Sequence, residues 1–225
     1  MNRPLIFGSI LPQNAGEIDS LMVDANASHA DWIEFRADKL NHPRKVFKHL
    51  SKQMKPILFT YRSTREGGFG NLTPLEVETL LADSLDYFDM IDVEATLPEE
   101  SLRRLRRLAT QKGKKILLSC HEFETDLPES VRQMKIDTLF KKKADVYKIA
   151  ILAENESVLR LLQEKGQQYA TTPHIFIAMG EKGLDTRMNP EKYGSLGIFA
   201  GVKGALAPGQ KNVEETYAFF TEGKV

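Results

Sequence analysis

The chain has little of several features that would assign a protein to a class at once. Among its 225 residues there is one cysteine, Cys120, which excludes an intramolecular disulfide and a zinc site built from cysteines. Its formal net charge is zero, so it has no excess of basic residues for binding nucleic acid. No stretch approaches the roughly 18–20 apolar residues of a membrane-spanning helix. The N-terminus also lacks the apolar length of a signal peptide. We therefore expect a cytoplasmic protein without nucleic-acid or membrane partners.

What the sequence does contain is a regular alternation of short apolar runs and helical patterns. Hydrophobic residues make up 41% and charged residues 28%, which suits one large α/β domain or two small ones. Apolar runs of this length, bounded by turn residues, predict buried strands. The predicted strands are Leu5–Leu11, Trp32–Phe35, Ile57–Tyr61, Met90–Val93, Ile116–Ser119, Val146–Ile151, Ile175–Met179 and Ile198–Val202.

The segments between these runs carry helix signals of their own. Thr73, Pro74 and Glu76 form a capping box with proline at the first helical position, and the helix that they open is expected to run toward Tyr87. Acidic residues in a first turn and apolar residues at helical spacing predict further helices. These are expected after Pro98, after Asp126-Leu127-Pro128, from Asn155 to Glu164 before Gly166, and from Lys211 to Phe220.

Strict alternation of strands and helices predicts a parallel sheet. Eight repeats in a chain of this length predict a (β/α)₈ barrel, or TIM barrel, which typically takes ~250 residues and can be as short as ~200. An open doubly wound sheet is the alternative, although no G-x-G-x-x-G motif follows the first strand to support a dinucleotide-binding version of it. No linker or composition break indicates a second domain, so we expect residues 1–225 to form a single barrel domain.

Lys148 lies inside the sixth predicted strand, where a lysine is energetically costly. Burial disfavours the charged amine, and it therefore lowers the pKa and makes the amine a nucleophile near neutral pH. The alternative is a lysine whose stem is buried while its amine reaches water.

Polar and charged residues follow seven of the eight predicted strands. In a barrel the carboxyl ends of the strands meet at one rim, so these side chains are expected to lie together. Of the five histidines, only His121 directly follows a strand. Asp38, Asp92 and Glu94 could instead form a buried ion-pair network. Asp92 and Glu94 could also bind a divalent metal ion, but two carboxylates are too few to predict a metal site. Glycine-rich turns after the last two strands are compatible with a phosphate site.

Together these segments resemble the type I 3-dehydroquinate dehydratases, the Schiff-base dehydratases of the shikimate pathway. They occur in the order found in that family and cover nearly the whole chain. The matching segments are Glu34-Phe35-Arg36-Ala37-Asp38, Thr60-Tyr61-Arg62 with Glu66-Gly67-Gly68, Asp92-Val93-Glu94, Ser119-Cys120-His121-Glu122-Phe123, Val146-Tyr147-Lys148-Ile149-Ala150, Met179-Gly180 through Arg187, Tyr193-Gly194-Ser195, and Ala207-Pro208-Gly209-Gln210.

The resemblance implies an enzyme, a carbon–oxygen lyase that reversibly dehydrates 3-dehydroquinate to 3-dehydroshikimate on the route to chorismate and the aromatic amino acids. It implies that Lys148 attacks the substrate ketone and forms an iminium. It also implies that His121 removes the neighbouring proton and then protonates the departing hydroxyl, a task that suits the pKa of an imidazole. Glu66 matches the glutamate that orients this histidine and tunes its charge.

The resemblance also implies how substrate is bound, without a metal or other cofactor. Arg187 matches the arginine that binds the substrate carboxylate, for which a planar bidentate donor is suited. The remaining matched positions would bind ring hydroxyls, form apolar walls or close a mobile loop over the site. They are Glu34, Arg36 and Arg62 for the hydroxyls, Met179 and Phe199 for the walls, and Gln210 for the loop.

Four positions depart from the family pattern. Thr186 stands where serine is common, Ile198 stands where threonine is frequent, and the other two departures bear on activity. Leu206 stands where serine is frequent, and Glu122 stands where aspartate is commoner. Because of these departures, a barrel that keeps the site without catalysing the reaction is one alternative. Another is a lysine-dependent barrel enzyme of the class I aldolase kind, acting on a phosphorylated sugar bound by the glycine-rich turns. Since family members are often dimers, we expect a homodimer.

Overall fold

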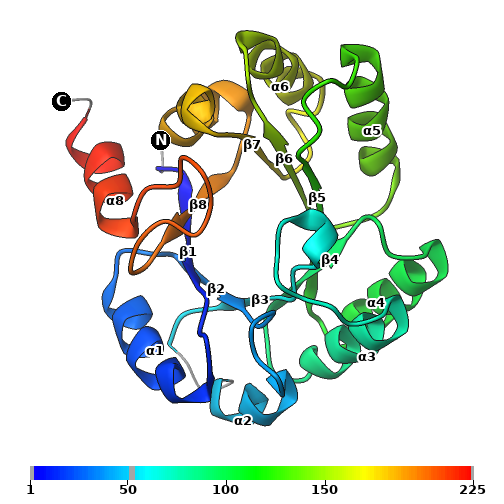
Figure 1. Ribbon diagram of the computed structural model, residues 1–225, viewed down its shortest axis with the longest axis vertical. Coiled ribbons are helices and arrows are strands. Elements are labelled where there is room, and N and C mark those ends of the chain that lie inside the picture. Colours follow the sequence, from blue (N-terminus) through cyan, green and yellow to red (C-terminus); the bar gives the residue numbers. More distant parts are fainter. Residues whose placement is uncertain (1–2, 51–53, 224–225) are drawn as a thin grey trace.

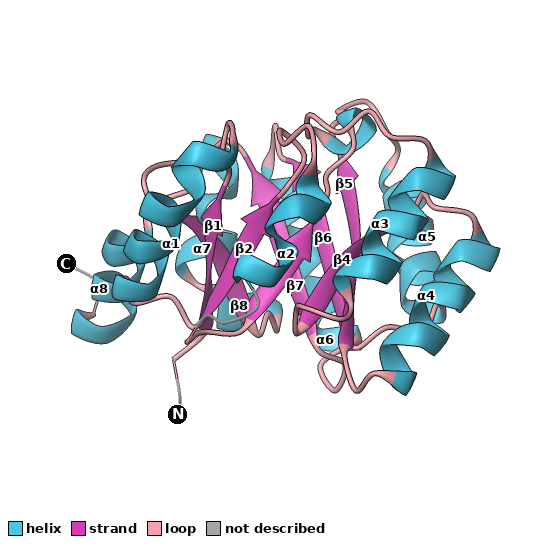
Figure 2. Cartoon of the chain, turned by 90° about the horizontal axis from the view of Figure 1, so that it is seen from below, coloured by secondary structure: helices cyan, strands magenta, loops and turns pink. Residues whose placement is uncertain are grey.

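The computed structural model describes residues 3–50 and 54–223, and within them eight parallel strands are arranged in a ring surrounded by helices (Figure 1). Seen from the side, the strands form the centre of the molecule and the helices cover them (Figure 2). The strands are β1 Leu5–Ile10, β2 Trp32–Arg36, β3 Ile57–Thr60, β4 Met90–Glu94, β5 Lys115–Glu122, β6 Val146–Leu152, β7 His174–Met179 and β8 Gly197–Gly201. The α-helices are α1 Ile18–Ala27, α2 Phe47–Leu50, α3 Pro74–Ser84, α4 Glu99–Gln111, α5 Glu129–Lys141, α6 Glu156–Gln168, α7 Leu184–Met188 and α8 Val213–Glu222.

The strands follow one another around the barrel in the order β7-β6-β5-β4-β3-β2-β1-β8. This order confirms the predicted (β/α)₈ barrel and excludes the open doubly wound alternative. One strand boundary matters for the site. The prediction that His121 follows a strand was wrong, because β5 continues through it: His121 pairs with Ala150 of β6, and Glu122 pairs with Ile151. His121 is therefore held by the sheet and not by a loop.

Two apolar layers follow from the alternation of side chains along each strand. On β6, Val146 and Ala150 point into the barrel, while Tyr147 and Ile149 pack outward against the helices. Lys148 lies between Val146 and Ala150 on the inner face, so the strand itself directs its side chain into the barrel. Within the barrel these side chains belong to an apolar floor. The floor consists of Phe7, Leu58, Met90, Leu117, Val146, Ala150, Ile175, Ile177, Met179 and Phe199.

Two helix predictions need correction. The capping box at Thr73 is present, with Glu76 Oε2 accepting from Thr73 N at 2.8 Å, but the helix ends at Ser84 and does not reach Tyr87. Gly166 does not end α6, which continues to Gln168. A Cβ atom at Gly166 would lie 2.2 Å from the carbonyl oxygen of Tyr193, so glycine is needed there for close packing.

The strands β7 and β8 lie at the two ends of the strand order, and no ladder joins them in the described part of the chain. At the bottom of the barrel Leu196 N donates to the carbonyl oxygen of His174 at 2.9 Å. Nearer the carboxyl ends of these strands, side chains of α7 bond to backbone groups of β7 and β8. None of the helices within the described ranges combines the length and hydropathy that crossing a membrane would require.

Candidate active site

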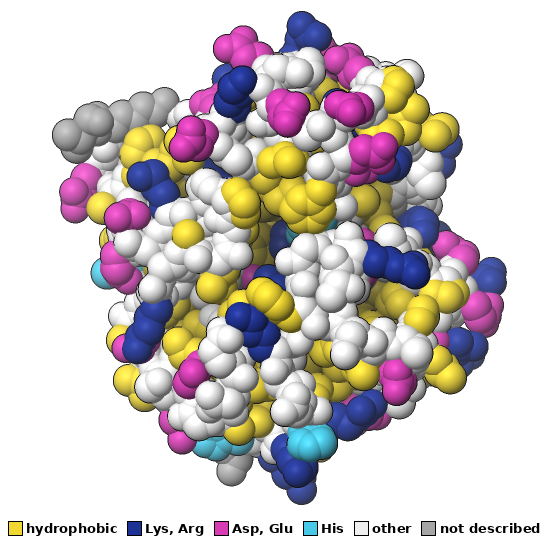
Figure 3. Space-filling model, viewed as in Figure 1, with side chains coloured by type: hydrophobic (Ala, Val, Ile, Leu, Met, Phe, Trp, Pro, Cys, Tyr) yellow, Lys and Arg dark blue, Asp and Glu magenta, His cyan; other side chains and the backbone are white. Residues whose placement is uncertain are grey.

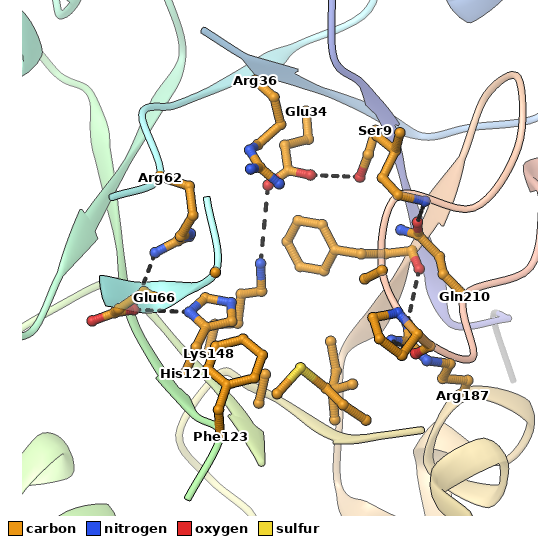
Figure 4. Close-up of a pocket in the computed structure, with 18 residues that line it drawn as sticks. Ser9, Glu34, Arg36, Arg62, Glu66, His121, Phe123, Lys148, Arg187 and Gln210 are labelled. Carbon is orange, nitrogen blue, oxygen red and sulfur yellow. Dashed lines mark hydrogen bonds and ion pairs between the residues drawn. The ribbon is translucent and has the colours of Figure 1, made fainter. Parts of the chain in front are cut away.

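A cavity of about 120 Å³ opens at the carboxyl ends of the strands. On this face the surface is hollowed near its middle, with Lys and Arg side chains deep in the hollow (Figure 3). All ten site residues expected from the sequence line this one cavity (Figure 4). They are Glu34, Arg36, Arg62, Glu66, His121, Lys148, Met179, Arg187, Phe199 and Gln210.

Lys148 is buried at the bottom of the cavity, with 6% of its surface exposed. Its Nζ lies 3.9 Å from Glu34 Oε1 and 3.8 Å from the centroid of the Phe199 ring. Burial lowers the pKa of Lys148 from 10.5 to about 8, although Glu34 and Asp92 act in the opposite direction. This shift increases the fraction of free amine at pH 7 by about 300-fold. The amine is thus enclosed rather than extended into solvent, which excludes the alternative drawn from the sequence.

His121 and Glu66 form a hydrogen-bonded pair, with 2.8 Å between His121 Nδ1 and Glu66 Oε2. Burial and the positive charges of Arg62 and Lys148 hold the pKa of His121 well below 6.5. Burial also raises the pKa of Glu66 to about 8, helped by nearby carboxylates and opposed by Arg62. Near neutral pH the ring is therefore uncharged and the carboxyl holds a proton, so the pair carries two protons, one on the ring and one on the carboxyl.

Arg62 is the centre of a buried network of carboxylates. Its Nη1 donates to Ser119 Oγ at 2.9 Å and to Glu94 Oε1 at 3.1 Å, and its Nη2 donates to Asp92 Oδ2 at 2.5 Å. Nη1 also reaches Glu66 Oε2 at 3.2 Å. Burial alone would lower the pKa of Arg62, but these acids raise it. The ion-pair network suspected for Asp92 and Glu94 is thus present, and it adjoins the cavity.

Glu34 and Arg36 come from the inner face of β2 and are each held by other side chains. Ser9 Oγ donates to Glu34 Oε2 at 2.5 Å, and Thr60 Oγ1 donates to Oε1 at 3.2 Å. Arg36 binds Asp38 through two hydrogen bonds of 2.7 and 2.8 Å. Asp38 therefore belongs to the Arg36 pair and not to the network around Arg62.

Arg187 has no acidic partner among the described residues, although only 3% of its surface is exposed. Its Nη1 and Nη2 donate to the carbonyl oxygens of Phe199 and Pro208, both at 3.3 Å, and its Nε has no hydrogen-bond partner in this part of the chain. Burial lowers the pKa of Arg187 to about 10. A buried guanidinium with open donors is a suitable site for an anion.

The loop between β8 and α8 covers one side of the cavity and contributes Leu206, Ala207, Pro208 and Gln210. Gln210 Oε1 accepts from the backbone N–H of Leu206 at 2.6 Å, so the amide oxygen is engaged inside the loop. Gly209 has φ 72°, and a Cβ there would lie 2.8 Å from the carbonyl oxygen of Gly180, which fixes glycine at this contact with the end of β7.

Sequence reasoning missed several lining residues, notably Ser9 and Phe123. A serine within a strand gives no signal by itself, but Ser9 follows Phe7 on the inner face of β1 and could have been found by that alternation. Phe123 covers Gly67, where a Cβ would lie 2.5 Å from its ring. Glu122 points away from the cavity to form an ion pair with Lys135, so this departure from the family pattern lies outside the lining.

A parallel (β/α)₈ barrel that encloses a desolvated lysine at the bottom of the cavity formed by its strand ends defines the chain as a TIM-barrel enzyme. The chain belongs to the type I 3-dehydroquinase family, whose sequence model matches residues 6–221. It is 33% identical over 204 residues to a 3-dehydroquinate dehydratase of Clostridium novyi, covering 82% of this chain and 79% of the relative. It is 32% identical over 228 residues to the enzyme of Shouchella clausii, covering 95% and 89%.

A solved structure of the type I enzyme from Clostridium difficile superposes with a TM-score of 0.89 at 25% identity, covering 99% of this chain and 92% of that one. The fold and the family therefore agree over nearly the whole length of both chains. The protein is a 3-dehydroquinate dehydratase, a hydro-lyase of the shikimate pathway. This assignment replaces the two alternatives drawn from the sequence, a sugar-phosphate aldolase and a non-catalytic barrel.

Proposed function

We propose that Lys148 is the nucleophile that forms a Schiff base with the ketone of 3-dehydroquinate. The observation that supports this most strongly is its burial in the cavity that His121 also lines, with a pKa lowered to about 8. The free amine attacks the carbonyl carbon, and the resulting carbinolamine loses water to give an iminium. Because the iminium withdraws electrons, a proton on the adjacent carbon becomes acidic.

We propose that His121 moves this proton. Its uncharged ring takes the proton from the carbon next to the iminium, and the electron pair of that bond forms an enamine. The enamine then expels the hydroxyl from the next carbon, which takes the proton back from His121 and leaves as water. Hydrolysis of the iminium releases 3-dehydroshikimate and restores Lys148. The ring keeps its N–H at Nδ1, hydrogen-bonded to Glu66 Oε2, which holds it oriented and leaves Nε2 free to take and return the proton.

We propose that the other lining residues bind the substrate. Arg187 binds the carboxylate, because among the buried cations that line this cavity it is the one without an acidic partner in the described residues. Glu34, Arg36 and Arg62 bind ring hydroxyls from the side of β2 and β3. Met179 and Phe199 form apolar walls. Gln210 closes the cavity through its amide N–H₂, since its oxygen is already bound to Leu206.

The Schiff base is tested by reducing the enzyme with borohydride in the presence of dehydroquinate, followed by intact-mass and peptide mass spectrometry. We expect a stable adduct on Lys148, none in Lys148→Met, and an undiminished adduct in His121→Ala with turnover strongly slowed. A folded wild-type protein without an adduct would contradict the mechanism. Loss of the adduct in His121→Ala would contradict the role proposed for His121.

We also propose that the enzyme acts in the cytoplasm as a homodimer. The proposal rests on the family, whose members are often dimers, and on the single cysteine, which suits a reducing compartment. Light scattering of the purified chain at micromolar concentration should give twice the monomer mass of 25.5 kDa. A monomer mass at these concentrations would contradict the dimer.

A further inference from the structure

The two strands that share no ladder, β7 and β8, are joined above the barrel floor by two consecutive residues of α7. Thr186 Oγ1 accepts from the backbone N–H of Ala178 in β7 at 3.0 Å. Arg187 Nη1 donates to the carbonyl oxygen of Phe199 in β8 at 3.3 Å. Side chains of α7 thus satisfy backbone groups that neighbouring strands satisfy elsewhere in the barrel. We call this junction between β7 and β8 the seam: Thr186 bonds to its β7 side and Arg187 bonds to its β8 side.

Thr186 is completely buried and fixes the start of α7 against β7. Besides accepting from Ala178, its hydroxyl donates to the carbonyl oxygen of Gly183 at 2.8 Å. The backbone is equally close, because a Cβ at Gly183 would lie only 2.0 Å from the carbonyl oxygen of Ala178. The hydroxyl therefore ties the turn before α7 to the strand at a point where the two backbones are already in contact.

Few contacts fix the guanidinium of Arg187 in place. Its two hydrogen bonds are long, its Nε is unpartnered in the described residues, and no carboxylate there forms an ion pair with it. By contrast, Arg36 and Arg62 are each fixed by acids at 2.5–2.8 Å. The position of the Arg187 guanidinium thus depends on where the backbone of α7 lies.

We propose that Thr186 is a positioning residue for Arg187: its hydroxyl fixes α7 to β7 and so sets where the guanidinium enters the cavity. The proposal rests on the role of Arg187 as the carboxylate site. It predicts that removing the hydroxyl weakens substrate binding while leaving the chemistry at Lys148 intact.

The test compares variants at the two ends of the seam. Thr186→Val keeps the shape but leaves the Ala178 N–H without its acceptor, and we expect KM for dehydroquinate to rise about tenfold with kcat within about twofold. Thr186→Ser should restore KM. Ser195→Ala is the matched control, because Ser195 Oγ accepts from Phe176 N at 2.9 Å lower on the same seam. It should lower the melting temperature and leave KM unchanged.

A double-variant cycle separates this inference from the proposed function. In an Arg187→Met background, Thr186→Val should raise KM no further, because the group that it positions is gone. Equal KM effects of Thr186→Val and Ser195→Ala, or a lower melting temperature with unchanged KM, would reduce Thr186 to a structural role and overturn the inference. An unchanged KM in Arg187→Met alone would instead overturn the carboxylate assignment. Should Thr186→Val not fold, Thr186→Ala carries the same expectations.

Discussion

Lys148 Nζ and Glu34 Oε1 lie 3.9 Å apart across the barrel, between the inner faces of β6 and β2. This distance is too long for a hydrogen bond but short enough for the carboxylate to favour the ammonium form. Glu34 is the largest of the influences that raise the pKa of Lys148 against its burial. Two opposing effects therefore set the pKa of Lys148. Burial favours loss of the ammonium proton, and the negative charge of Glu34 limits this effect so that the pKa stays near 8.

Replacing Glu34 by glutamine should shift this balance. Without the carboxylate the pKa of Lys148 falls further below 8, so the rise of kcat/KM with pH should move to lower pH by about one unit. The measurement is the pH profile of kcat/KM, whose midpoint is independent of any loss in substrate affinity. Ser9→Ala is the control, since it removes a hydrogen bond to Glu34 but keeps the charge. A midpoint that stays in place in Glu34→Gln would contradict the coupling.

The buried amine should also lower the stability of the fold. The pKa of Lys148 is lower when folded, about 8, than the 10.5 of an unfolded lysine. The charged form is therefore disfavoured in the fold, with a full penalty below pH 8 that fades as the pH rises toward 10.5. Lys148→Met removes the penalty, on the order of 3 kcal/mol at pH 7 and about 1 kcal/mol at pH 10. Urea unfolding at both pH values measures the gain.

Lys165→Met provides the comparison for this prediction. Lys165 is buried to a similar degree, but its Nζ binds Asp137 at 2.6 Å and Gln168 at 2.9 Å. Removing it leaves Asp137 bonded to Tyr169 but without its ion-pair partner, so this variant should lose stability at pH 7. If Lys148→Met were also destabilised, the amine would be contributing to the fold rather than costing it stability. Lys148→Met should in any case be inactive, and activity above a few per cent would contradict the role proposed for Lys148 as nucleophile.

The fold and part of the site could be predicted because they depend on local patterns. The period-two alternation of β6 places Lys148 inside the barrel, and the barrel brings the strand ends to one rim. Contacts between distant segments have no such local signal. Glu66 lies in a short turn after β3, and without the resemblance nothing in the sequence pairs it with His121, 55 residues away. The seam at Thr186 was missed because a helix that replaces strand pairing leaves no periodic pattern.

Glu66→Gln should have an effect that depends on pH. The pKa of Glu66 is raised to about 8, so near pH 6 the carboxyl is protonated and an amide resembles it. We expect the ratio of kcat/KM for the variant and the wild type to be near one at that pH. It should fall above about pH 8, where only the wild type gains a carboxylate beside His121. Glu122→Gln is the control, because Glu122 faces Lys135 outside the cavity. A ratio that is constant with pH would contradict the shifted pKa.

The same shift predicts how Glu66 affects stability. A carboxyl whose pKa is raised from 4.5 to about 8 in the fold stabilises the protein most in its protonated form. That contribution is complete below pH 4.5 and is lost as the pH rises to 8. Glu66→Gln does not titrate, so its free energy of unfolding relative to the wild type should increase between these pH values. Parallel denaturation curves measured near pH 5 and pH 8 show whether it does.

Leu206 places an apolar, 38% exposed side chain at the edge of a cavity that receives a substrate with several hydroxyls. Its backbone N–H already holds Gln210 Oε1, so the loop does not need the Leu206 side chain to engage Gln210. Leu206→Ser keeps that backbone bond and adds a hydroxyl at the rim. A hydrogen bond to substrate is worth about 1 kcal/mol, so KM should fall by roughly fivefold with kcat little changed. Leu206→Ala removes the same apolar surface without adding a hydroxyl and should leave KM higher than Leu206→Ser. Equal KM values in the two variants would mean that the hydroxyl makes no contact with substrate and that this departure from the family pattern affects only the apolar rim.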